Sequence, residues 1–161
     1  MSTLDKTFFG RKDYRIDPKG RITLSADYYS KLNLTENSHV VIVCSPCEEE
    51  RYLELFSEEE WAKKQMLVDN MDEGEIKDYF LNNYIGAAER IELDGQNRIR
   101  LPKYMIEYAG IDKDVVFVGV ISNLRIWAKE NLEPKSRITK QNLYDAINKA
   151  KQKVVEGRGD K

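Results

Sequence analysis

The amino-acid sequence predicts an α+β protein made of two tandem, pseudo-symmetric β-hairpin units with short helices, followed by a C-terminal helical tail. The first observation is a repeat: DPKGR at 17–21 returns as DGQNR at 94–98, each followed by Ile, one residue and Leu. The second is an apolar alternation of period two on both sides of each copy, which is typical of strands. The third is a series of apolar residues near helical spacing that starts at Ile138, with lysines on the other faces.

The repeat extends well beyond the motif. An offset of 77 positions keeps apolar residues on apolar residues across both copies, which indicates a duplicated unit. The matched pairs include Tyr14–Ile91, Ile16–Leu93, Asp17–Asp94, Arg21–Arg98, Ile22–Ile99 and Leu24–Leu101. We therefore expect a first unit over 8–61, a helical connector over 62–84, a second unit over 85–127 and the tail over 128–161.

Each motif has the composition of a tight turn between two strands. Asp17 at the first position, proline at the second and Gly20 at the fourth form a type I turn signature, in which Gly20 is free to adopt positive φ. Asn97 replaces Gly20 in the second copy, and asparagine is one of the few other residues that tolerate the left-handed region. Because the alternation resumes after each turn, we expect a strand, a turn and a second strand that form a hairpin.

Short helices are expected between the strands. They cover 25–32, 57–68, 75–84 and 102–110, and the tail helix starts near Ile138. Ser25 is the expected N-cap of the first helix, and Ser57 with Glu60 has the pattern of a capping box. Pro102 and Gly110 are the expected start and end of the helix in the second unit.

The charge distribution leaves DNA binding open, although the chain is slightly acidic with a formal net charge of −2. Residues 1–31 hold 7 Lys and Arg against 4 Asp and Glu, a net +3, whereas residues 32–78 hold 4 against 13, a net −9. Residues 128–161 hold 9 against 5, a net +4. A local basic face can bind phosphates even when the whole chain is acidic.

A membrane protein is not expected. The sequence has no run close to the ~20 apolar residues that a membrane helix needs, and no apolar signal core at its beginning. We therefore expect a cytoplasmic protein with no membrane partner.

An enzyme is not expected either, because the single histidine, His39, has no nucleophile beside it and the chain has no Gly-rich phosphate loop. No cofactor and no metal site are expected. Cys44 and Cys47 form a CSPC stretch, for which a turn with two free thiols is the favoured interpretation. A labile disulfide and a metal site shared between subunits remain alternatives.

The candidate functional residues are cations on or beside the two turns. The first copy contributes Arg11, Lys12, Arg15, Lys19 and Arg21, and the second copy adds Arg98 and Arg100. A two-stranded β element fits the major groove, where arginine bonds guanine bidentately and lysine holds phosphates. We expect Asp17 to fix the rotamer of Arg21, which then reads or clamps DNA. Asp94 has the same expected role toward Arg98.

A purely structural role is the alternative for these Asp–Arg pairs. A carboxylate in a turn can accept backbone N–H bonds, and an exposed pair with arginine contributes about 0.5–1 kcal/mol. Glu89 and Glu92 precede the second motif and weaken it as a phosphate binder. The two copies are therefore expected to contribute unequally.

These motifs resemble those of the MraZ proteins, bacterial regulators built from two tandem units of the AbrB-like swapped-hairpin type. The resemblance covers roughly residues 8–127. Its most specific parts are FFG at 8–10, IDPKGRITL at 16–24, AAERIELDGQNRIRLP at 87–102, and the AGI and VVFVGV stretches that follow. The resemblance implies that Arg21 and Arg98 contact DNA, with the aspartates of the same motifs as their partners.

The resemblance also implies a function. Proteins similar to this chain act as transcriptional regulators at repeated sequences upstream of the division and cell-wall gene cluster. They assemble into rings that present several hairpins to the DNA. This implies a nucleoid-associated protein that binds double-stranded DNA as a homo-oligomer, an octamer or larger. The chain departs from the family pattern at Asn97, where glycine is usual, and in the long basic tail after Trp127.

The alternative function is a protein-interaction module, such as an antitoxin that neutralises a partner with its tail. The resemblance implies that antitoxins with this hairpin fold contain a single copy of the unit, followed by a long tail without a fold of its own. The duplication argues against this alternative, and the amphipathic segment 138–154 argues for it.

Overall fold

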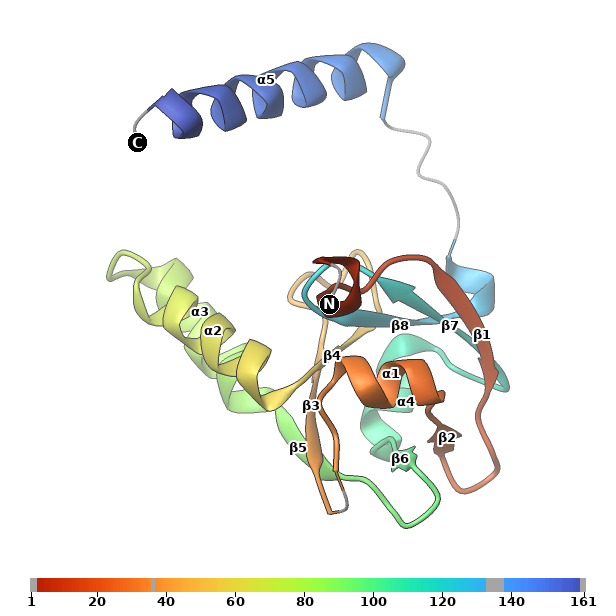
Figure 1. Cartoon of the computed structure of the whole chain (residues 1–161). Helices are drawn as coiled ribbons and strands as arrows, with labels where there is room; N and C mark the ends of the chain where they lie inside the picture. Colours follow the sequence, from red (N-terminus) through yellow and green to blue (C-terminus); the bar gives the residue numbers. More distant parts are fainter. Residues whose placement is uncertain (1–2, 36, 133–137, 160–161) are drawn as a thin grey trace.

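The computed structural model describes residues 3–35, 37–132 and 138–159. The strands are β1 (Arg11–Arg15), β2 (Arg21–Thr23), β3 (His39–Cys44), β4 (Leu53–Phe56), β5 (Glu89–Glu92), β6 (Arg98–Arg100), β7 (Asp114–Gly119) and β8 (Leu124–Ala128). The α-helices are α1 (Ala26–Lys31), α2 (Glu58–Asp69), α3 (Glu75–Asn83), α4 (Lys103–Ala109) and α5 (Lys140–Gly159). Short 3-10 helices are η1 (Thr3–Lys6), η2 (Ile85–Ala87) and η3 (Lys129–Asn131). The α+β class predicted from the sequence is confirmed (Figure 1).

The strands form two sheets. Six of them lie in the order β1-β7-β8-β4-β3-β5, and β2 pairs with β6 as a separate two-stranded ribbon. All pairs are antiparallel. The two repeats therefore interleave, because β1 of the first copy pairs with β7 of the second, and β5 of the second copy pairs with β3 of the first. The predicted boundaries of the first unit (8–61), the connector (62–84), the second unit (85–127) and the tail (128–161) therefore stay predictions from the sequence repeat.

The expected pairing of the two arms of each turn with one another is wrong. Each turn has two backbone bonds of its own; in the first turn the Asp17 N–H donates to the Arg21 carbonyl at 3.0 Å and the Gly20 N–H donates to the Asp17 carbonyl at 2.9 Å. Beyond the turn the arms pair with strands of the other copy. Period-two alternation reports which side chains are buried, not which strand lies alongside. Two copies with the same alternation satisfy it equally well with their own arms or with exchanged arms.

The β2–β6 ribbon has a pseudo-twofold axis. Its register pairs Arg21 with Arg100, Ile22 with Ile99, and Thr23 with Arg98. Since the repeat offset is 77 positions, Ile22 lies opposite its own equivalent in the second copy. Both isoleucines are fully buried, so the axis passes through the core. The ribbon is therefore one composite element to which each copy contributes one strand.

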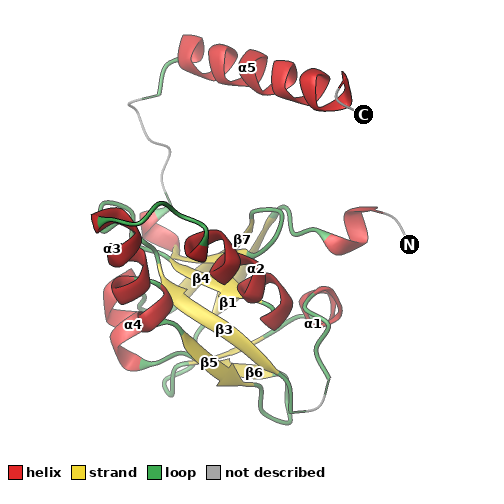
Figure 2. Ribbon diagram, turned by 90° about the vertical axis from the view of Figure 1, so that its left-hand side faces the viewer, coloured by secondary structure: helices red, strands yellow, loops and turns green. Residues whose placement is uncertain are grey.

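The core lies between the six-stranded sheet, the ribbon and the short helices. It contains Ile22 and Ile99 together with sheet residues such as Ile42, Phe117 and Ile126. A second cluster lies between the sheet and the α2–α3 hairpin, where the Trp61 ring is 5.2 Å from Phe56 and 5.5 Å from Tyr84. Figure 2 shows this hairpin against the sheet.

The predicted helix ends are largely confirmed. The Ser25 hydroxyl accepts the N–H of Tyr28 at 3.3 Å, and the Ser57 hydroxyl accepts that of Glu60 at 3.1 Å. Gly110 ends α4 in the left-handed conformation at φ +66°. The apolar spacing after Ile138 corresponds to α5, which begins at Lys140.

The CSPC stretch forms the turn between β3 and β4, and both cysteines are free thiols, as the favoured interpretation predicts. Burial, with a smaller contribution from Glu89, raises the pKa of Cys44 to about 11, which keeps that thiol protonated at neutral pH. Within the described ranges, no three His, Cys, Asp or Glu side chains gather as a metal site. None of the helices described is both long and apolar enough to span a membrane.

A buried polar cluster lies under the α2–α3 hairpin. Glu54 pairs with Arg125 across β4 and β8, and one carboxylate oxygen of Glu54 is buried without a hydrogen bond, as are the Tyr84 hydroxyl and Arg125 Nε. Burial raises the pKa of Glu54, while Tyr84, Lys64 and Arg125 act in the opposite direction. The neutral form of this carboxyl is therefore favoured by folding.

Candidate nucleic-acid interface

The first Asp–Arg turn is held by its aspartate. Asp17 Oδ1 accepts the backbone N–H groups of Lys19 at 2.9 Å and Arg21 at 2.8 Å, and Oδ2 accepts Arg21 Nε at 2.6 Å. The Gly20 N–H closes the turn on the Asp17 carbonyl at 2.9 Å, and Gly20 has φ +80°. One carboxylate therefore both folds the turn and fixes the guanidinium.

The second turn reproduces this geometry. Asp94 Oδ1 accepts the N–H groups of Gln96 at 2.9 Å and Arg98 at 3.0 Å, and Oδ2 accepts Arg98 Nε at 2.7 Å. Asn97 has φ +57°, so the expectation that it adopts the left-handed conformation of Gly20 is confirmed. The loss of glycine in the second motif leaves the path of the turn unchanged.

Hydrogen bonds lower the pKa of both aspartates. For Asp17 the largest cause is the backbone N–H of Arg21, partly opposed by desolvation and reinforced by the Arg21 guanidinium. For Asp94 desolvation is the largest single influence and raises the pKa, but the hydrogen bonds from Arg98 and Gln96 together outweigh it. Both carboxylates are thus ionised at neutral pH and held against a guanidinium.

Each arginine keeps its outer end free. The Nε of Arg21 and of Arg98 is used by its aspartate, and no Nη atom of either hydrogen-bonds to a residue that the structure describes. An arginine has four N–H groups on its two Nη atoms, in one plane and suited to paired acceptors. The aspartate therefore presents the arginine end-on to a ligand outside the protein.

The arginines of both copies lie on one surface. Because Ile22 and Ile99 point into the core, Arg21, Arg98 and Arg100 project from the opposite side of the β2–β6 ribbon. Figure 1 shows both turns at the end of the molecule where this ribbon lies.

The two turns are also locked to the other copy. The Leu101 N–H donates to the Gly20 carbonyl at 2.8 Å, and the Leu24 N–H donates to the Asn97 carbonyl at 2.9 Å. Arg100 Nε adds a bond to the Lys19 carbonyl at 3.1 Å. The surface is therefore rigid across the boundary between the repeats.

The cations of β1 are placed differently. Lys12 points toward α1, where its Nζ donates to the Ser25 hydroxyl at 3.2 Å and lies 4.6 Å from the centre of the Tyr28 ring. Arg15 is exposed near the first turn, with its Nε 3.6 Å from Asp114. Arg11 is exposed at the other end of β1, about 13 Å away at the rise of a strand. Lys19 is exposed within the turn itself. Of the four predicted cations Arg11, Lys12, Arg15 and Lys19, only Arg15 and Lys19 adjoin the surface that carries Arg21 and Arg98.

Sequence reasoning missed Lys103. This residue lines an open groove of about 830 Å³ beside the ribbon, together with Lys19, Gly20 and Arg100. The sequence signal was available, since Lys103 follows Pro102, five residues after the end of the second motif. Lys103 therefore adds a cation to the groove that Lys19 and Arg100 line.

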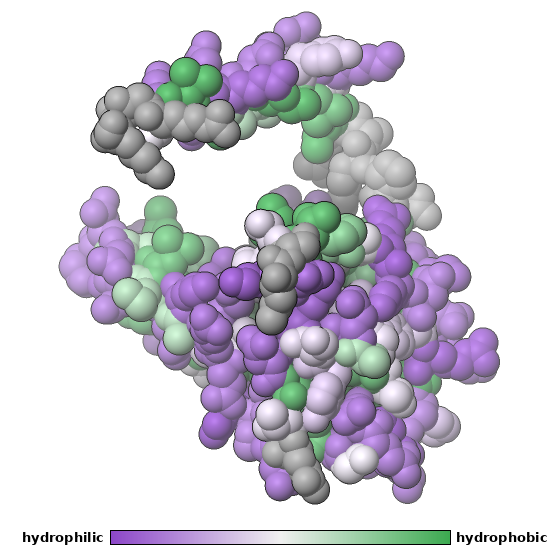
Figure 3. Space-filling model, in the orientation of Figure 1, coloured by the Kyte–Doolittle hydropathy of each residue, from purple (hydrophilic) through white to green (hydrophobic). Residues whose placement is uncertain are grey.

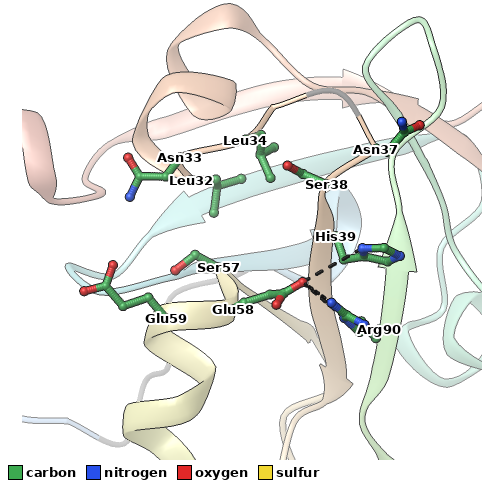
Figure 4. Close-up of a pocket in the computed structure, with 10 residues that line it drawn as sticks. All are labelled: Leu32, Asn33, Leu34, Asn37, Ser38, His39, Ser57, Glu58, Glu59 and Arg90. Carbon is green, nitrogen blue, oxygen red and sulfur yellow. Dashed lines mark hydrogen bonds and ion pairs between the residues drawn. The ribbon is translucent and has the colours of Figure 1, made fainter.

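A second hollow, of about 370 Å³, lies between the start of α2 and strands β3 and β5 (Figure 4). Its charged groups neutralise one another: Glu58 accepts Arg90 Nη2 at 2.9 Å and lies 3.9 Å from His39 Nδ1. These contacts fasten α2 to the sheet. Among the residues that line it, no nucleophile is paired with a base as acyl or phosphoryl transfer requires.

A sequence model of the MraZ protein family, described as antitoxin-like, matches residues 7–73 and 84–157. The chain belongs to the MraZ family. The resemblance inferred from the motifs at 8–127 is confirmed, and the match extends into α5.

Several MraZ relatives share the match. The protein named transcriptional regulator MraZ in Lachnoclostridium phytofermentans is 35% identical over 133 residues, which cover 80% of this chain and 86% of that protein. The protein of the same name in Clostridium beijerinckii is 34% identical, over 76% of this chain and 82% of that protein. The one in Nitratidesulfovibrio vulgaris is also 34% identical, over 74% and 79%. Transcriptional regulation is not an enzymatic function, so the prediction that the chain is not an enzyme is confirmed.

Proposed function

We propose that this MraZ-family chain is a sequence-specific DNA-binding transcriptional regulator that reads double-stranded DNA with the β2–β6 ribbon and its two aspartate-held arginines. One observation carries the proposal: Arg21 and Arg98 are fixed through Nε, their side chains remain 28% and 25% exposed, and no Nη group of either hydrogen-bonds to a described residue. A guanidinium in this state suits bidentate contact with guanine O6 and N7 in the major groove. The names of the relatives, transcriptional regulator MraZ, support the same function.

The surrounding cations supply affinity without sequence information. Lys19, Arg15, Arg100 and Lys103 are exposed around the two arginines, and Lys and Arg at such positions bind phosphates. The contribution is unequal, because the position of Arg15 in the first copy is taken by Glu92 in the second. The first turn is therefore the stronger phosphate binder.

The same proposal includes assembly into a ring-shaped homo-oligomer, an octamer or larger, on repeated sites upstream of the division and cell-wall gene cluster. One ribbon with a few cations binds weakly at cellular salt concentrations. Several ribbons on one rigid ring, matched to direct repeats, raise the effective concentration of every contact after the first. Such a protein acts in the cytoplasm, at the nucleoid.

Fluorescence anisotropy tests the proposal. The protein is titrated into a duplex taken from upstream of its own gene and into a shuffled duplex of the same composition, at several salt concentrations. We expect tight binding to the first duplex only, with an affinity that falls steeply as salt rises. Equal affinity for both duplexes, or none for either, contradicts sequence-specific regulation.

A further inference from the structure

Among the residues that the structure describes, none covers the apolar side of the amphipathic helix α5. Every described side chain from Lys140 to Gly157 is exposed. The exposed apolar side chains include Leu143 at 52%, Ile147 at 51% and Val154 at 56%, spaced so that they fall on one side of the helix. In proteins most of the stability of a helix comes from tertiary packing of its amphipathic face. The apolar stripe therefore indicates a surface on which α5 packs.

The α2–α3 hairpin presents a suitable surface. One side of it packs on the sheet through Trp61, whereas Met66 at 66%, Leu67 at 60%, Ile76 at 73% and Leu81 at 40% are exposed. Figure 3 shows apolar residues on this hairpin and on α5. Both elements thus leave large apolar side chains in water that a helix–helix contact would bury.

The charges of the two elements select the pairing. Residues 58–83 hold 8 Asp and Glu against 3 Lys, a net −5, whereas residues 140–159 hold 5 Lys and Arg against 2 acidic residues, a net +3. Two α5 helices repel one another, and so do two hairpins, but α5 and the hairpin attract. Charge complementarity therefore favours α5 on the α2–α3 hairpin over either self-association.

We infer that α5 of one copy packs against the α2–α3 hairpin of a second copy and forms a three-helix contact between subunits. Both surfaces are exposed in the structure. The two surfaces are different, which makes the contact heterologous, and a heterologous contact that repeats around an axis closes into a ring. At 1.5 Å per residue α5 is about 30 Å long, enough to cover the hairpin along its length.

This inference rests on the homo-oligomer proposed above, and light scattering coupled to size exclusion tests it without DNA. Ile147→Glu places a charge in the apolar stripe of α5, and Leu67→Glu does the same on the hairpin. Gln152→Glu is the matched control, because Gln152 lies on the opposite side of α5 and is exposed. Glutamate has a high helix propensity and all three positions are exposed, so the fold is retained, which circular dichroism checks.

We expect the wild type and Gln152→Glu to share one high mass, and Ile147→Glu and Leu67→Glu to be monomers. An equimolar mixture of those two variants should form a heterodimer, because the intact hairpin of the first accepts the intact α5 of the second. Two monomers in the mixture overturn the inference, because the intact α5 of one variant then does not bind the intact hairpin of the other. A wild-type mass in both variants overturns the α5 contact but leaves the ring, whereas a monomeric wild type overturns both.

Discussion

Replacing Arg21 by lysine should separate sequence recognition from charge. Arg21 donates Nε to Asp17 at 2.6 Å and keeps four N–H groups on its Nη atoms for DNA. Lysine keeps the positive charge but has one nitrogen, which cannot bond a carboxylate and two guanine acceptors in one plane. A good bidentate contact is worth about 1–3 kcal/mol of discrimination, so Arg21→Lys should lower the preference for the specific duplex about 5- to 140-fold.

The assay is the ratio of the dissociation constants for the upstream duplex and its shuffled counterpart, measured by anisotropy over a series of salt concentrations. The slope of log affinity against log salt should stay near that of the wild type, because the number of cations is unchanged. Arg51→Lys is the control. Arg51 lies in the turn between β3 and β4, where its Nε donates to the Glu48 carbonyl at 3.2 Å, and the change should leave the ratio intact.

Two results would refute this reasoning. A wild-type ratio for Arg21→Lys means that only the charge of the residue matters. An equal loss of affinity for both duplexes means that Arg21 contacts phosphates and does not read bases.

Three further predictions concern stability. Gly20→Ala places a side chain at φ +80° and should lower the free energy of unfolding in urea by about 1–2 kcal/mol. Asn97→Gly, at φ +57°, should change the same free energy by less than about 0.5 kcal/mol. Equal losses for the two substitutions would show that the two turns differ from this geometry. Nuclear magnetic resonance titration should give Asp17 and Asp94 pKa values below 3.8. The two carboxylates then stabilise the fold above pH 3.8, and this stabilisation is lost as pH falls through the lowered pKa values. Titration midpoints at or above 3.8 would contradict the prediction. Burial raises the pKa of Glu54 above 4.5, so the contribution of this carboxyl to folding stability is full below pH 4.5 and is lost as pH rises. Glu54→Gln should therefore raise the thermal midpoint at pH 7 more than at pH 4.5. Parallel pH profiles of the thermal midpoint for the variant and the wild type would contradict this prediction.

Local features of the fold were predictable from the sequence because local chemistry decides them. The turn needs a residue in the left-handed conformation at its fourth position, and Gly20 and Asn97, which occupy that position in the two copies, both adopt positive φ. The caps at Ser25 and Ser57 follow from hydroxyl acceptors placed before helical stretches. The exchange of strands was not predictable from alternation, because burial of Ile or Val on one face says nothing about which copy supplies the neighbouring strand.

The candidate site was predictable in its centre and less so at its edges. The Asp–Arg spacing of four residues places the carboxylate against Nε in both turns, which the repeat alone suggested. Lys12 is close to the motif in sequence but lies on the inner side of β1 with Tyr14. Counting the cations near the motif in the sequence therefore overestimates the number of cations on the DNA-binding surface. Arg100 joins the surface through a contact with Lys19 of the other copy, which only the strand exchange explains.

The most direct test of the central claim is the affinity of Arg21→Ala and Arg98→Ala for the upstream duplex, measured beside the wild type by anisotropy. If the two copies form one DNA-reading surface, each substitution abolishes specific binding while circular dichroism and the thermal midpoint stay near the wild type. Normal specific binding by Arg21→Ala would show that the pair with Asp17 only holds the turn, and the claim would be wrong.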